Sequence, residues 1–156
     1  MKTNIQYITG DATEPIGNGI KVIIHICNDV GAWGAGFVMA LSKKWKEPEV
    51  HYRALKKYTL GDVHFIPVEP DIIVVNMIAQ HDIHPDSNNY PPIRYTALKK
   101  ALEKVDEYCW MNSAETPHSI HMPRIGCGLA GGRWELIEET IQMAGVECQV
   151  TVYDFE

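Results

Sequence analysis

The chain has 156 residues, 46% of them hydrophobic and 22% charged, which are the size and composition of one folded domain. Its formal net charge of −6 argues against a nucleic-acid-binding protein, because such proteins usually present a basic face to the phosphate backbone. No apolar stretch approaches the length of a membrane span, and the four cysteines are widely spaced. We therefore predict a single domain over residues 1–156 that lies in the cytoplasm, keeps its thiols reduced and has no membrane partner.

The first half of the chain predicts three strands and two helices. The dense β-branched run at residues 22–27 is typical of a strand that is covered on both faces. The segment before Gly61 has the pattern of a polar helix that ends at residue 58. The predicted elements are strands at 5–8, 22–27 and 63–67 and helices at 36–45 and 49–58.

The second half of the chain continues the alternation of strands and helices. The run at 72–78 is almost wholly apolar and is predicted to be a central strand. Residues 80–92 carry three prolines and many polar side chains, so they are predicted to form a loop that is long enough to be functional. The remaining predictions are helices at 94–111 and 134–144 and strands at 119–122 and 149–153. This order predicts an α/β fold around a largely parallel sheet.

Two glycine-rich segments each follow a predicted strand and each open into a predicted helix. The first glycine segment, residues 24–36, reads IHICNDVGAWGAG, and the second glycine segment, residues 122–132, reads MPRIGCGLAGG. Glycine lets backbone amides approach a ligand closely, and a helix N-terminus adds donors and the positive end of a dipole. Ligands of open α/β sheets bind beyond the carboxyl ends of the strands. The pair therefore favours a diphosphate site over two plain strand-to-helix turns.

Four polar side chains near these turns each allow two interpretations. Asn28 and Asp29 are expected to make local Asx hydrogen bonds, and Asn28 is also suited to hold a ribose hydroxyl or a water. His25 is either a satisfied core histidine or a general acid or base. Asp11 is either a turn aspartate or an acceptor for an exocyclic amine such as that of adenine.

The histidine and cysteine spacings do not favour a metal or a covalent mechanism. The pairs at 81 and 84 and at 118 and 121 have no matching cysteine or carboxylate pair, so no metal or other cofactor is expected. Cys127 lies in the second glycine segment without an evident base partner, which argues against a cysteine nucleophile.

Taken together, these motifs resemble the macrodomain family over nearly the whole chain. The resemblance rests on Gly10-Asp11 after the first strand, on His25-x-x-Asn28 with its glycine turn, and on the run from Met122 to Leu129 that precedes a Trp-Glu helix. It implies a three-layer α/β/α fold with a mixed, largely parallel central sheet, and ADP-ribose as the ligand. The run at 122–129 is the most specific part and points to the branch of ADP-ribose glycohydrolases and ADP-ribose 1″-phosphate phosphatases.

The resemblance also implies which residues hold ADP-ribose. Asp11 would contact the adenine amine, Ala12 would add a backbone contact, and Asn28 would meet the distal ribose. The two glycine segments would enclose the diphosphate and the distal ribose with Gly31, Trp33, Gly34, Ala35, Gly36, Gly126, Cys127, Gly128, Leu129, Ala130 and Gly131.

Two departures from the glycohydrolase pattern shape the functional hypothesis. Gln80 and Ala130 stand where that branch has a lysine and an aspartate, and neither can form a lysyl adduct or act as a carboxylate base. The surroundings of His25 and the turn at 31–36 are more similar to the phosphatases. We therefore expect hydrolysis of ADP-ribose 1″-phosphate or a related distal-ribose derivative, in which Asn28 orients the ribose or water and His25 or Asp29 handles the proton.

Two alternatives remain open at the level of the sequence. One is a non-catalytic module that recognises ADP-ribose, which the two missing catalytic groups favour. The other is a hydrolase that removes ADP-ribose from a modified macromolecule, such as an ADP-ribosylated protein. ADP-ribose linked to a DNA base is a less attractive substrate because the chain is acidic.

Overall fold

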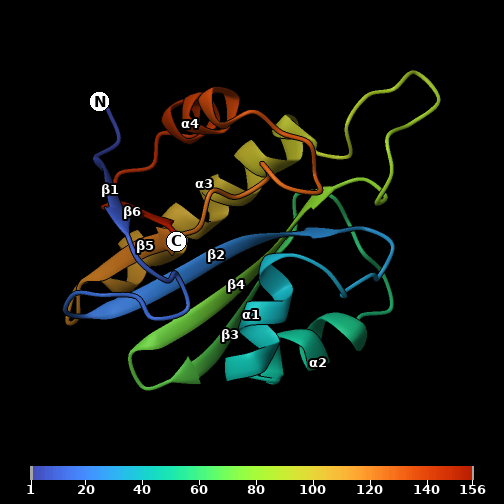
Figure 1. Ribbon diagram of the computed structural model, residues 1–156. Coiled ribbons are helices and arrows are strands. Elements are labelled where there is room, and N and C mark those ends of the chain that lie inside the picture. Colours follow the sequence, from blue (N-terminus) through green and yellow to red (C-terminus); the bar gives the residue numbers. More distant parts are fainter. Residues whose placement is uncertain (1, 156) are drawn as a thin grey trace.

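The computed structural model describes residues 2–155 and places six strands in one sheet (Figure 1). The strand order is β1-β6-β5-β2-β4-β3, and only β3 runs antiparallel to its neighbour. The strands are β1 (Ile5–Thr9), β2 (Ile20–Asn28), β3 (Val63–Glu69), β4 (Ile72–Gln80), β5 (His118–Met122) and β6 (Val150–Asp154). This is the mixed, largely parallel sheet that was predicted.

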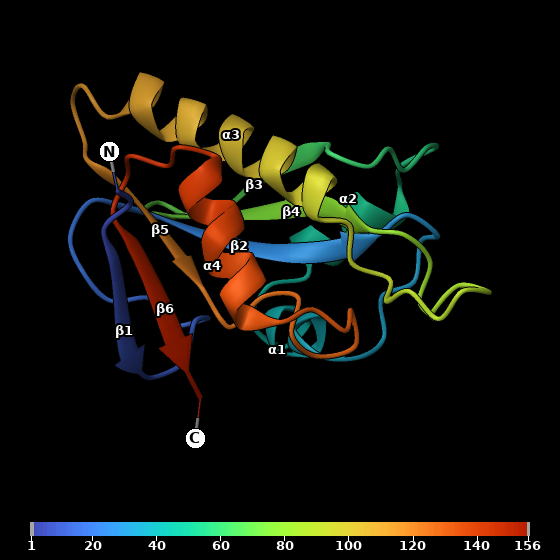
Figure 2. The same cartoon turned by 90° about the horizontal axis from the view of Figure 1, so that it is seen from above.

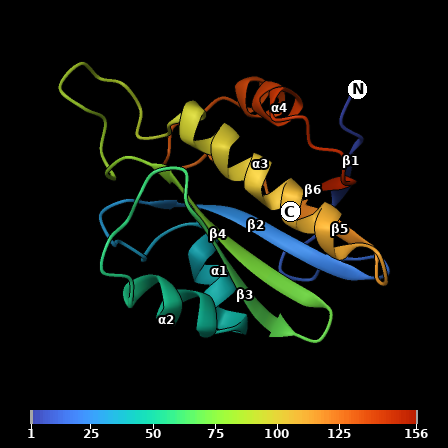
Figure 3. The same cartoon turned by 180° about the vertical axis from the view of Figure 1, so that it is seen from behind.

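Helices cover both faces of the sheet and complete three layers (Figures 1 and 2). The helices α1 (Phe37–Lys44) and α2 (Glu47–Arg53) lie on one face, and α3 (Tyr95–Asn112) and α4 (Trp134–Met143) lie on the other. The view from behind shows the same division (Figure 3). The predicted α/β/α fold class is confirmed. Within residues 2–155, no helix is long and apolar enough to cross a membrane.

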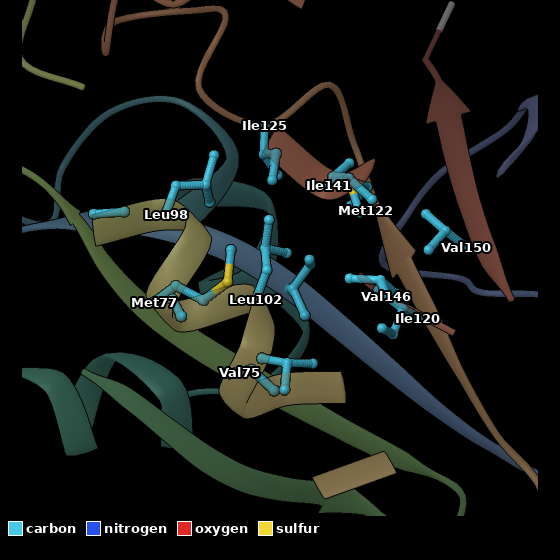
Figure 4. Close-up of a cluster of buried hydrophobic side chains, with 14 of the residues drawn as sticks. Val75, Met77, Leu98, Leu102, Ile120, Met122, Ile125, Ile141, Val146 and Val150 are labelled. Carbon is cyan, nitrogen blue, oxygen red and sulfur yellow. The ribbon is translucent and has the colours of Figure 1, made fainter. Parts of the chain in front are cut away.

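The alternation of side chains along β4 explains why the core is divided into two clusters. All nine residues of β4 are buried, since helices pack on both faces of this strand. Val75 and Met77 point toward α3, where they meet Leu98 and Leu102 in the larger cluster (Figure 4). The intervening Val74 belongs to the smaller cluster beneath α1 and α2.

The structure corrects two element boundaries. The helix predicted over 49–58 is α2, which begins at Glu47 and ends at Arg53. It ends early because the chain turns to place Tyr58 against the first glycine segment, where its ring contacts Tyr52 and would touch a side chain at Gly31. Gln80 belongs to β4 rather than to the following loop, so the loop starts at residue 81.

Candidate functional site

A cavity of about 630 Å³ lies at the edge of the sheet where the parallel strands end. This volume is within the range of small-molecule sites. Its walls come from the end of β2 and the first glycine segment, from the end of β4 and the loop after it, and from the second glycine segment. The three segments are distant in sequence and meet here because β5, β2 and β4 are adjacent and parallel.

The side-chain amide of Asn28 organises the first glycine segment. Its Oδ1 accepts hydrogen bonds from the backbone amides of Val30 and Ala32, at 3.1 and 3.0 Å, and from the Tyr52 hydroxyl at 2.7 Å. Its Nδ2 donates to the Ala32 carbonyl at 2.7 Å. The local hydrogen bonding expected for Asn28 is therefore present. Because an amide nitrogen carries two hydrogens, Nδ2 of Asn28, which lines the cavity, has one further hydrogen to donate.

Asp29 lies outside the cavity lining, and its carboxylate binds the next loop instead of making the local Asx hydrogen bond that the sequence predicts. Its Oδ1 accepts from the backbone amide of Asp82, and its Oδ2 accepts from Nδ1 of His81, both at 2.8 Å. Partial burial by itself raises the pKa of Asp29, but the hydrogen bonds from Asp82 and His81 outweigh it and hold the pKa below its ordinary value. Asp29 is therefore an anchor for the start of the loop at 81–92.

His25 is a satisfied core histidine at the back of the cavity. Its ring is 2% exposed and donates from Nε2 to Oδ1 of Asn76 at 2.5 Å. The Trp33 ring meets it edge-on, with ring centres 5.5 Å apart. Burial lowers the pKa of His25 to about 4, although the hydrogen bond to Asn76 opposes the shift. The ring is therefore neutral at physiological pH, and its Nε2 is already bonded.

The glycines of the two segments serve two different purposes. Gly126 and Gly131 have left-handed φ values of 74° and 73°, and a Cβ on them would lie 2.6 and 2.8 Å from Ile93 and Pro91. These two glycines are required by the turn itself. Gly34 and Gly128 do not have left-handed φ values, and apart from the adjoining residues of the chain no protein atom lies within 4 Å of the position that a Cβ would take. Both line the cavity, so the absence of a side chain leaves their backbone open to a ligand.

The charge distribution of the cavity suits an anion. Arg124 lines the cavity, bonds the Asp154 carboxylate through Nε and Nη2 at 2.6 and 3.0 Å, and lies 5.1 Å from the rings of both Tyr7 and Trp134. The first residues of α1 also line it and bring the positive end of that helix. Among the described residues, none that lines the cavity is acidic.

Comparison with known proteins identifies the family, although no family model matches the sequence. A structure from Bacteroides thetaiotaomicron, of a protein of unknown function, is 53% identical, with a TM-score of 0.91 over 97% of this chain and 98% of that chain. A macrodomain protein from Streptomyces coelicolor is 42% identical, with a TM-score of 0.78 over 97% of this chain and 99% of that chain. The chain belongs to the macrodomain family.

This macrodomain also resembles proteins with named activities. It is 28% identical over 143 residues to the ADP-ribose 1″-phosphate phosphatase of Candida albicans, a match that covers 88% of this chain and 92% of that protein. It is 31% identical over 153 residues to the chromodomain-helicase-DNA-binding protein 1-like of mouse, but it spans only 16% of the length of that relative.

The sequence-predicted site residues of the macrodomain divide into two groups. Those that line the cavity are His25, Asn28, Trp33, Gly34, Ala35, Gly126, Gly128, Leu129 and Ala130. Those outside its lining are Asp11, Ala12, Asp29, Gly31, Gly36, Cys127 and Gly131. Oδ1 of Asp11 accepts hydrogen bonds from the backbone amide and the hydroxyl of Thr13, both at 2.8 Å, as expected of a turn aspartate.

Several lining residues were not predicted as part of the site. Arg124 belongs to the second glycine segment and follows the end of β5 by two residues, so its position in the sequence could have indicated that it lines the cavity. Phe37 and Val38 follow from the position of a helix start beside a glycine turn. Ile83 and His84 belong to the loop at 81–92. The length and composition of this loop predict a functional role, but they do not indicate which of its residues line the cavity.

Proposed function

We propose that this macrodomain binds ADP-ribose in the cavity between its two glycine segments and hydrolyses ADP-ribose 1″-phosphate to ADP-ribose and phosphate. The observation that carries the proposal is the bare backbone at Gly34 and Gly128, which both line one cavity and have no steric or conformational need for glycine. Backbone amides and a helix start bind phosphate groups without adding positive charge, which fits an acidic chain. The similarity to an ADP-ribose 1″-phosphate phosphatase supports the reaction.

In this proposal the ligand follows the arrangement that the family resemblance implies. The diphosphate lies between residues 31–36 and residues 126–131, which include Cys127. The free Nδ2 hydrogen of Asn28 meets the distal ribose. Asp11 and Ala12 take the adenine end. The substrate is a free ADP-ribose derivative, and an ADP-ribosylated protein is a partner that an open cavity of this kind could also admit.

The arrangement favours hydrolysis by positioning and by electrostatic stabilisation. Fixed amides hold the diphosphate so that the distal phosphate has one orientation relative to the attacking water. The start of α1 provides positive potential where negative charge develops, whereas the charge of Arg124 is paired with Asp154.

Adding side chains at the bare glycines tests the binding site. We expect Gly34→Val and Gly128→Val each to raise the Kd for ADP-ribose at least about tenfold, because the new methyl groups occupy space that the ligand needs. Isothermal titration calorimetry measures this change. Ala114→Val, in the exposed turn after α3, is the matched control and should bind as the wild type does. Unchanged affinity in both glycine variants would place the ligand elsewhere.

A second candidate function is a module that recognises ADP-ribose without turnover. The favouring observation is that the polar groups first considered for catalysis are already occupied: His25 binds Asn76, and Asp29 binds the 81–92 loop. Measuring phosphate release from ADP-ribose 1″-phosphate beside ADP-ribose binding separates the two functions. Binding without release of phosphate, or of ADP-ribose from a modified protein, would establish the recognition module.

A further inference from the structure

We infer that His84, on the loop at 81–92, donates the proton to the leaving oxygen in the hydrolysis, and that Asp29 is a positioning residue that holds this loop beside the cavity. The inference rests on the proposed phosphatase function. It moves proton transfer away from His25 and Asp29, where the sequence had suggested it.

The titratable side chains that line the cavity are few, and they can be compared directly. They are His25, Cys27, His84 and Arg124. His25 is buried and bonded to Asn76, burial raises the pKa of the Cys27 thiol far above neutrality, and arginine does not release its proton in proteins. His84 is exposed, and its ring makes no hydrogen bond to another of residues 2–155. It is therefore the lining imidazole that is free to contact a substrate in the cavity.

The loop that carries His84 is fixed at its beginning. Asp29 binds both the His81 ring and the Asp82 amide, and Asp82 adopts a left-handed φ of 63°, which turns the chain toward Ile83 and His84. Aspartate tolerates this conformation better than most residues. The two residues that follow the turn are the ones that line the cavity.

The far end of the loop is also held. Arg94 donates from Nη1 to the carbonyls of Pro91 and Pro92 at 2.6 and 3.1 Å, and its Nη2 lies 4.0 Å from the Asp86 carboxylate. Asp86 in turn accepts from the backbone amide of Tyr90 at 3.0 Å. The loop projects beyond the end of β4 in Figures 1 and 3, anchored at its two ends. Because both ends of the loop are held, the range of positions open to His84 is restricted and the residue stays at the cavity.

The proposed step is a water-dependent cleavage of a phosphate monoester. The oxygen of water bonds to phosphorus as the bond between phosphorus and the C1″ oxygen breaks, and the electron pair of that bond passes to the C1″ oxygen. Protonated His84 gives its proton to this oxygen, which becomes the 1″-hydroxyl of ADP-ribose. The proton of the attacking water leaves with phosphate or solvent, and His84 is protonated again from solvent.

The test is the pH dependence of kcat for phosphate release from ADP-ribose 1″-phosphate. In the wild type, kcat should decrease as rising pH removes the proton from the general acid. His84→Gln should lower kcat by roughly 100-fold and remove that decrease. The substrate phosphate titrates in the same range in every variant, so the difference between profiles is the signature. The titratable and charged groups close to His84 in the sequence are His81, Asp82 and Asp86, Arg124 lines the same cavity, and Asp29 binds His81.

Two further variants distinguish proton transfer from a structural effect. Added imidazole should restore part of the activity of His84→Ala, because it can occupy the space and donate a proton. Asp29→Asn should lower kcat but keep the wild-type shape of the pH profile. His51→Gln, on the exposed side of α2, is the histidine control and should behave as the wild type.

The outcomes separate this inference from the proposed function. A His84→Gln enzyme with the wild-type kcat and pH profile would overturn the role of His84 while leaving the phosphatase in place. An Asp29→Asn enzyme with the wild-type kcat would show that Asp29 does not position the loop. A wild-type protein that binds ADP-ribose but releases no phosphate would overturn the phosphatase function and the role of His84 with it.

Discussion

At the scale of single residues, Asn28 shows how one side chain can be indispensable to a site through the backbone that it shapes. Its amide satisfies two backbone donors, one backbone acceptor and the buried Tyr52 hydroxyl. The same side chain lines the cavity, and its Nδ2 carries one hydrogen beyond the one donated to Ala32. Loss of activity on removing Asn28 would therefore report on the shape of the first glycine segment as well as on any contact with ribose.

The stability of two variants measures the structural part of this role. We expect Asn28→Ala to lower the free energy of unfolding by about 2–4 kcal/mol, because several buried polar groups lose their partner. Tyr52→Phe removes only the hydroxyl, which lies 2.7 Å from both the backbone and the side-chain oxygen of Asn28, and should cost about 1 kcal/mol. Urea denaturation measures both. An Asn28→Ala protein as stable as the wild type would show that the amide does not hold the segment.

The residue scale also shows where prediction from sequence succeeds and where it ends. An asparagine at the start of a turn commonly accepts hydrogen bonds from the backbone amides that follow it, and Asn28 does so in the structure. The position of His84 depends on a contact between Asp29 and His81, which lie on different loops. No local pattern encodes such a contact, so the sequence marked the loop but not the residue.

At the scale of elements, the second glycine segment combines a rigid turn with an open wall. Ile125 is 4% exposed and lies in the core beside Met122 and Ile141, as Figure 4 shows. Gly126 follows with its left-handed backbone against Ile93. Gly128, two residues later, faces the cavity. The segment is thus anchored on one side and free to meet a ligand on the other.

Alanine at these two glycines should separate stability from binding. We expect Gly126→Ala to lower the free energy of unfolding by about 1–3 kcal/mol, because its φ of 74° is strained for alanine and the methyl group would collide with Ile93. Gly128→Ala should unfold within about 0.5 kcal/mol of the wild type and bind ADP-ribose more weakly. Urea denaturation and calorimetry measure the two effects. Equal losses of stability would contradict this division.

The end of α2 shows the same limit of prediction at this scale. The polar pattern over 49–58 suits a helix throughout, but the structure ends the helix at Arg53. The reason is tertiary, since Tyr58 donates a hydrogen bond to the Tyr52 carbonyl at 3.0 Å and packs against the first glycine segment. Periodicity describes which face is apolar, but it cannot show a competing contact outside the helix.

At the scale of the whole molecule, two histidines are buried on the same face of the sheet. His25 lies beneath α1 and α2, and His121 lies under residues 10–19, where it is hydrogen-bonded to Ser119 and Tyr153 at 2.7 Å each. Burial lowers the pKa of His25 to about 4, and burial together with the positive charge of Lys21 lowers the pKa of His121 to about 4. Both rings are therefore neutral in the folded protein at pH 7.

This burial predicts a loss of stability in mild acid. The unfolded chain takes up a proton on each ring as the pH falls below about 6.5, whereas the folded chain does not until about pH 4. The free energy of unfolding should therefore decrease by about 2 kcal/mol per ring between pH 7 and pH 5. Urea denaturation at the two pH values measures this. His121→Gln should reduce the pH-dependent loss, and an unchanged loss would show that His121 does not contribute.

The layered fold itself was predictable because the alternation of strands and helices is a property of the whole sequence. The apolar run of β4 indicated a central strand, and the structure places it between β2 and β3. No sequence pattern indicated the positions of β1 and β6 in the sheet. Their positions depend on which strand edge remains unpaired once the other strands have assembled.

The pairing of β1 with β6 has a consequence for synthesis of the chain. Ile5 aligns with Val150 and Thr9 with Asp154, and β6 is the sole strand neighbour of β1 among the described residues. Residues 20–112 contain β2, β3 and β4 with the helices that cover them, whereas β1 can pair only after residues 150–154 have been made. Closing so long a loop is entropically costly and slow. Until β6 has paired with it, β5 has an open edge with unpaired backbone groups, and such an edge favours aggregation of a partly folded chain.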